Sequence, residues 1–124
     1  MKDSRPVNLD LTKFKFPLPA ITSILHRISG VLIFFGIAIL LYLLDLSLRS
    51  PEGFSRASDW LVSPLVKFVV WVILSGLFYH LIAGIKHLTL DLGLGETTGG
   101  ARASAIGTLV LAGIAAVIAG VWLW

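Results

Sequence analysis

Three long runs without a charged residue constrain the fold of this chain more than any other feature. Seventeen uncharged residues separate Arg27 from Asp45, eighteen separate Lys67 from Lys86, and twenty-two follow Arg102. A helix rises about 1.5 Å per residue, so roughly 20 apolar residues cross the ~30 Å hydrocarbon core of a bilayer. In lipid each backbone N–H and C=O needs an internal partner, which makes each run a helix.

The sequence therefore predicts an all-α integral membrane protein whose three transmembrane helices form one bundle. The charged fraction of 14% agrees, because soluble domains usually carry about 25%. We place a tail at 1–20, the helices at about 21–48, 64–90 and 102–124, and loops rich in Pro, Gly and Ser at 50–64 and 91–104.

Basic residues are more numerous on one side of the three spans than on the other. Seven lie with the N-terminal tail and the second loop, and three lie with the first loop. The positive-inside rule then places the N-terminus inside and the C-terminus outside, with Trp122 and Trp124 as anchors at the outer interface. Because these residues flank apolar runs, they do not indicate nucleic-acid binding. The polar start predicts no cleaved signal peptide.

The chain contains no cysteine. This excludes disulfides, thiolate metal sites, iron–sulfur ligation and covalent c-type haem attachment within it. A metal or haem would need other ligands, of which histidine is the most suitable.

His80 lies inside the second apolar run, where an ionisable ring is costly and suggests a functional site. Gly76 and Gly84 stand four residues before and after it, so they share its helix face. The missing side chains would leave a flat slot beside the imidazole, as a haem ligand needs. Alternatively, His80 bonds a neighbouring helix and the glycines allow close packing. Spacing alone leaves both interpretations open.

Three polar residues share a face near the start of the first span, namely Ser23, His26 and Arg27. A hydroxyl and a guanidinium one turn apart can both donate to a carbonyl or an anion. Alternatively, Arg27 reaches the phosphate headgroups and Ser23 bonds its own helix. Asp91 follows at the inner end of the second span, either as a proton relay or as a solvated carboxylate.

The third span carries an unbroken row of small residues, which predicts a face for close helix packing. The row consists of Ser104, Thr108, Ala112, Ala116 and Gly120. We assign it a structural role, because the span has no ionisable group beyond Arg102.

Four segments together resemble the cytochrome b556 subunit family of succinate dehydrogenase. They are RPVNLDL, SILHRISG, SPEGF and HLIAGIKHLTLDLG, and they follow in the family's order over most of the chain. The resemblance implies a membrane anchor of complex II, with a flavoprotein, an iron–sulfur protein and a second small anchor as partners. Electrons from succinate would pass through these subunits to ubiquinone.

The resemblance also implies roles for individual residues. A b haem would lie between the two anchors, with His80 as the axial iron ligand from this chain and Gly76 and Gly84 beside it. Ser23 and Arg27 match residues of the quinone site, and His26 and Arg27 match positions near the haem propionates. The small-residue rows of the second and third spans are expected to dock the partner anchor.

Lys86 stands where members of this family often carry arginine, and lysine cannot make a bidentate contact. His87 and the segment 94–102 receive no role. The alternatives are a fumarate reductase anchor, a cofactor-free structural membrane subunit and a self-associating cytochrome. The absence of a transit peptide favours a bacterial inner membrane over a mitochondrial one.

Overall fold

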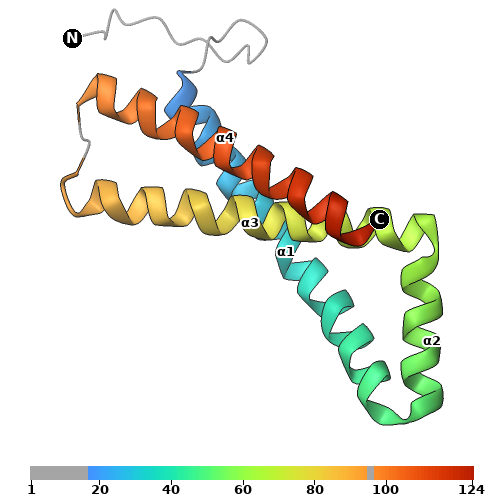
Figure 1. Ribbon diagram of the computed structural model, residues 1–124. Helices are drawn as coiled ribbons and strands as arrows, with labels where there is room; N and C mark the ends of the chain where they lie inside the picture. The colour runs from blue at the N-terminus through green and yellow to red at the C-terminus, as the bar shows by residue number, and fades with distance from the viewer. Residues whose placement is uncertain (1–16, 95–96) are drawn as a thin grey trace, which may run out of the picture.

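The computed structural model describes residues 17–94 and 97–124, and this part of the chain is all-α (Figure 1). Its helices are α1 (Leu18–Arg49), α2 (Pro51–Val62), α3 (Pro64–Asp91) and α4 (Thr98–Leu123). By length and composition, α1, α3 and α4 can each cross a membrane. The prediction of an all-α protein with three spans is thereby confirmed. Most of the N-terminal tail, with four of the basic residues that set the predicted orientation, lies outside the described residues.

The prediction of a loop at 50–64 was wrong, because most of this segment forms α2. Its Pro and Gly suggested a turn, but Ser-Pro-Glu is also a strong helix start. The Ser50 hydroxyl accepts a hydrogen bond of 2.9 Å from the Gly53 N–H, Pro51 occupies the first turn, and Glu52 complements the helix dipole. Ser63 and Pro64 then start α3, with the proline again in the first turn but without a side-chain cap from Ser63.

Helices α3 and α4 lie alongside each other, while α1 crosses them and diverges (Figure 1). Helix α2 connects the far end of α1 to the start of α3. The buried core is thin and consists mostly of small residues, whereas large apolar side chains such as Phe34 and Leu48 are exposed. Such a surface suits contact with lipid and with other membrane subunits.

The small-residue row of α4 packs against α3 within this chain. Thr108 and Ala112 are buried, the Trp71 indole donates to the Ala116 carbonyl at 2.8 Å, and a Cβ on Gly120 would lie 3.3 Å from that indole nitrogen. The predicted packing face is confirmed. Ser104, Ala116 and Gly120 are only half-buried, and docking of a partner anchor on this row stays a prediction.

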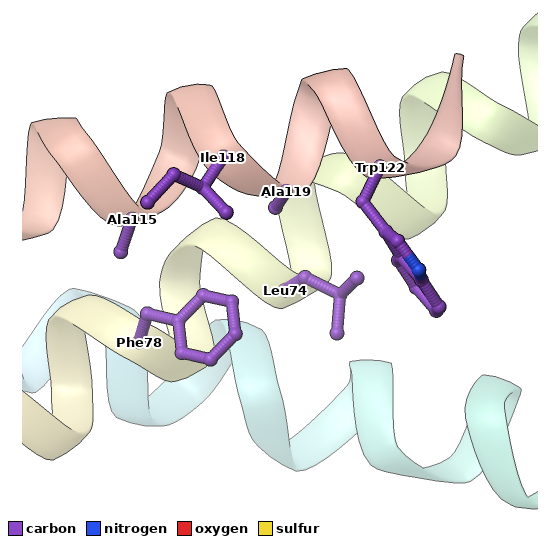
Figure 2. A pocket seen from close by; sticks show the side chains of 6 residues that line it. All are labelled: Leu74, Phe78, Ala115, Ile118, Ala119 and Trp122. Carbon is purple, nitrogen blue, oxygen red and sulfur yellow. The ribbon is translucent and has the colours of Figure 1, made fainter.

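An apolar cavity of about 380 Å³ remains between the middle of α3 and the C-terminal half of α4 (Figure 2). The side chains that line it are Leu74, Phe78, Ala115, Ile118, Ala119 and Trp122. None of them carries a charge, so the cavity suits hydrocarbon.

Helix α3 ends in a Schellman motif. Gly93 has a φ of 83°, its N–H donates to the Leu90 carbonyl, and the Leu94 N–H donates to the Thr89 carbonyl, both at 3.0 Å. This residue in the left-handed conformation ends the helix just after Asp91.

Candidate functional site

The ring of His80 is held by α1. Its Nδ1 atom lies 3.0 Å from the Ser29 hydroxyl and 3.1 Å from the backbone carbonyl oxygen of His26. The Ser29 hydroxyl in turn donates to the same carbonyl at 2.7 Å. Two helices that are far apart in sequence therefore meet at this imidazole, and both contacts lie on one edge of the ring.

The carbonyl partner decides where the proton of His80 sits. A carbonyl oxygen only accepts, so Nδ1 must carry the hydrogen in this contact. In the neutral ring Nε2 then keeps its lone pair, and this is the atom that can bind a metal. Nε2 has no hydrogen-bond partner among the described residues and is not enclosed by them. The arrangement is that of a histidine oriented for metal binding by a backbone carbonyl.

Two further histidines continue from this ring, His26 against His80 and His87 against His26. His26 stacks on His80 with ring centroids 4.0 Å apart and an angle of 8° between the planes. His87 meets His26 edge-on at a centroid distance of 5.1 Å. The stack covers one face of the His80 ring and leaves its Nε2 edge uncovered. The structure thus brings together His80 and His26, both of which the sequence analysis selected.

The glycines around His80 contact α1. A Cβ on Gly76 would lie 2.6 Å from a Leu32 methyl carbon, and one on Gly84 would lie 3.6 Å from the Nε2 atom of His26. Their positions therefore agree with the packing interpretation, and their place beside a haem stays a prediction. A third glycine lies nearer the ring, because a Cβ on Gly30 would be 3.2 Å from the His80 Cε1 atom.

Ser23 and Arg27 lie on the first turns of α1. Ser23 is half-buried and Arg27 is exposed, and neither side chain bonds another described residue. The hydroxyls of Thr22 and Ser29 do bond back to their own helix, at 2.9 and 2.7 Å. Among the described residues, the Ser23 hydroxyl therefore differs from those of Thr22 and Ser29, and the binding roles of Ser23 and Arg27 stay predictions.

Asp91 is exposed at the end of α3 and has no ion-pair partner among the described residues. Its role as a proton relay stays a prediction. Lys86, to which the sequence analysis gave no role, is only 6% exposed and donates to the Thr22 hydroxyl at 2.6 Å.

Ser29 and Gly30 are the site residues that sequence reasoning missed. Both lie within the segment SILHRISG, three and four residues after His26, so they share its helix face. That spacing was a usable signal. Reading the face one turn further along α1 would have found both.

Residues 1–120 match the family described as the succinate dehydrogenase/fumarate reductase transmembrane subunit. The succinate dehydrogenase cytochrome b556 subunit of Coxiella burnetii is 46% identical over 125 residues, which cover both chains completely. The subunit of the same name from Paracoccus denitrificans is 38% identical over 76% of this chain and 72% of its own length.

A mitochondrial protein with a related name is also similar to this chain. The succinate dehydrogenase cytochrome b560 subunit of Mus musculus is 32% identical over 88% of this chain and 66% of its own length. Together with three spans and an all-α architecture, these matches fix the family. The chain therefore belongs to the succinate dehydrogenase/fumarate reductase transmembrane subunit family, as a membrane anchor of the cytochrome b type in an oxidoreductase complex.

Proposed function

We propose that this chain binds haem b together with a second anchor subunit and forms part of the ubiquinone-reduction site of succinate dehydrogenase. The observation that carries the proposal is the set of contacts at His80. Its Nδ1 atom is bonded to α1, and its Nε2 atom has no hydrogen-bond partner among the described residues. In a membrane span such an imidazole needs a partner, and a metal is one that its free lone pair fits.

His80 fits the role of axial ligand to haem iron. The chain has no cysteine, and the described residues contain no cluster of His, Asp and Glu suited to a free metal ion. A single oriented histidine is what a haem shared between two subunits would need from each one. Arg27 and His26 would neutralise and bond the propionates, and Gly76 and Gly84 would border the same region. When bound, haem would supply one-electron redox chemistry.

Ser23 and Arg27 would hold the quinone. The Ser23 hydroxyl would donate a hydrogen bond to a quinone carbonyl oxygen. The Arg27 guanidinium, one turn further along α1, would stabilise the negative charge that the quinone gains with electrons. Asp91, exposed at the same end of the bundle, is the candidate that delivers protons from the inner aqueous side.

The chain would act only within a complex. A flavoprotein would oxidise succinate, an iron–sulfur protein would carry the electrons, and a second small anchor would supply the other haem ligand. The relatives named above are all succinate dehydrogenase subunits, which favours this direction over fumarate reduction. We assign the complex to a bacterial inner membrane, with the N-terminus inside.

The first experiment purifies the complex through this subunit and compares reduced-minus-oxidised spectra of the wild type and His80→Ala. A b-type signal that His80→Ala abolishes or shifts, with the soluble subunits still present, supports the axial role. An unchanged signal in His80→Ala removes His80 as the ligand. A wild-type complex without haem and without soluble partners leaves the cofactor-free structural subunit as the better interpretation.

The second experiment tests the quinone site through Arg27→Leu and Ser23→Ala. Both variants should impair quinone reduction, while electron transfer from succinate to an artificial dye acceptor survives, since that reaction bypasses the anchor. Arg49→Leu is the matched control, because Arg49 lies at the opposite end of α1 and pairs with Asp45. Equal loss of both activities would count against a quinone role.

A further inference from the structure

Lys86 and Thr22 form a buried contact between α3 and α1. Lys86 is 6% exposed and Thr22 is fully buried, and the Lys86 Nζ atom donates to the Thr22 hydroxyl at 2.6 Å. That hydroxyl donates its own hydrogen to the Pro19 carbonyl at 2.9 Å. The direction of each hydrogen bond is therefore defined, and the chain of contacts runs from α3 to the first turn of α1.

Tyr79 makes a second connection to the same residue. Its hydroxyl donates to the backbone carbonyl of Thr22 at 2.7 Å. Tyr79 and Lys86 are seven residues apart, so they lie about two turns apart on one face of α3. Between them on that face is Ala83, which is fully buried. Both the side chain and the main chain of Thr22 are thus held from α3.

The residue held in this way directly precedes Ser23. Adjacent Cα atoms are about 3.8 Å apart across a rigid trans peptide, so a shift of Thr22 also moves Ser23. The Ser23 side chain makes no hydrogen bond to a described residue, so no polar contact of its own holds the hydroxyl. The first turn of α1 also begins without a side-chain cap. The hydrogen bonds from α3 are therefore the polar contacts that hold this turn against the bundle.

We propose that Lys86 and Tyr79 are positioning residues that place Ser23 for the quinone by holding Thr22. The inference rests on the proposed role of Ser23 and adds what determines its geometry. Lysine suits this task, because a single hydroxyl acceptor needs one flexible donor and not the planar fork of arginine.

The test uses the purified complex and compares Thr22→Val, Lys86→Met and Tyr79→Phe with the wild type. Thr22→Val should raise the apparent KM for a short-chain ubiquinone about tenfold, since a misplacement of 1 Å can cost as much as ~100-fold. Lys86→Met should act in the same way, Lys86→Arg should restore part of the loss because it keeps a donor, and Tyr79→Phe should have a smaller effect. Haem content and dye-coupled succinate oxidation should stay at wild-type levels.

Thr108→Val is the matched control. Thr108 is 3% exposed, and among the described residues its hydroxyl bonds only the Ser104 carbonyl of its own helix. The Thr108→Val variant removes a buried threonine hydroxyl and changes no residue of α1. An equal rise of the quinone KM in Thr108→Val and Thr22→Val would show a general packing effect and overturn the proposal.

The decisive comparison places Thr22→Val in a Ser23→Ala background. If Thr22 acts through Ser23, its tenfold effect on KM disappears there, because the group that it positions is gone. If Thr22→Val raises the quinone KM by the same factor in both backgrounds, the positioning role is wrong, although Ser23 can still bind the quinone. If Ser23→Ala alone leaves quinone kinetics unchanged, the assignment of Ser23 fails, and the positioning inference fails with it.

Discussion

The imidazole of His26 lies almost parallel to that of His80, at a centroid distance of 4.0 Å. The backbone carbonyl of His26 also accepts a hydrogen bond from His80, so one residue of α1 restrains both the face and one edge of the ring. With two torsions restricted in this way, the Nε2 atom has a defined direction before any ligand arrives. Such pre-orientation strengthens metal binding, because less freedom is lost on ligation.

Ser29→Ala should weaken haem retention. The substitution removes the hydroxyl 3.0 Å from the His80 Nδ1 atom and leaves the His26 carbonyl as its only restraint on that edge. Loss of such an outer partner typically costs 10–100-fold in metal affinity. The measurement is the haem-to-protein ratio after washing in detergent. Ser47→Ala is the control, since Ser47 also bonds back to its own helix but at the far end of α1.

Gly30→Ala should shift the haem spectrum or midpoint potential. Its Cβ would lie 3.2 Å from the His80 Cε1 atom, so the ring must move by a few tenths of an ångström. Gly113→Ala is the matched control, because nothing lies within 4 Å of its Cβ position. An identical spectrum in both variants would mean that Gly30 does not restrict the ring.

Trp71→Phe should destabilise the packing of α4 on α3. The Trp71 indole donates to the Ala116 carbonyl at 2.8 Å, and hydrogen bonds between membrane helices contribute about 0.6 kcal/mol on average. We expect a lower midpoint of thermal unfolding in detergent. Trp122→Phe is the comparison, because its exposed ring borders the apolar cavity of Figure 2 and makes no hydrogen bond to a described residue. Equal shifts would indicate lost apolar area and not the lost bond.

The three spans could be predicted from the sequence, because the length and hydrophobicity of each run are local properties. The selection of His80 and His26 as candidate residues also followed from their positions along single helices. It did not indicate that Lys86 bonds Thr22, since this depends on how α3 is rotated against α1. Two residues 64 positions apart carry no local signal of contact. The same applies to the α4 row, whose small residues suit any close partner, so the sequence could not tell α3 from another subunit.

The α2 error has a different cause. Pro51 and Gly53 are residue types that favour turns, but their position within a helix decides their effect. Pro51 occupies the first turn, where its missing N–H costs nothing. Gly53 is buried against α1, where a Cβ would clash with the Leu46 carbonyl oxygen. The glycine at position 53 therefore reflects close packing between α1 and α2 and not a bend in the chain.

The orientation of the chain in the membrane can be tested with single cysteines, because the natural sequence has none. Ser55 is exposed on α2 and Thr98 is exposed at the start of α4, on opposite sides of the spans. With the N-terminus inside, a membrane-impermeant maleimide added to intact cells should label Ser55→Cys. It should label Thr98→Cys only after permeabilisation, since the excess of basic residues keeps that side in the cytoplasm. The reverse pattern would invert the topology and place the Ser23 and Arg27 end of α1 outside, away from soluble subunits on the cytoplasmic side.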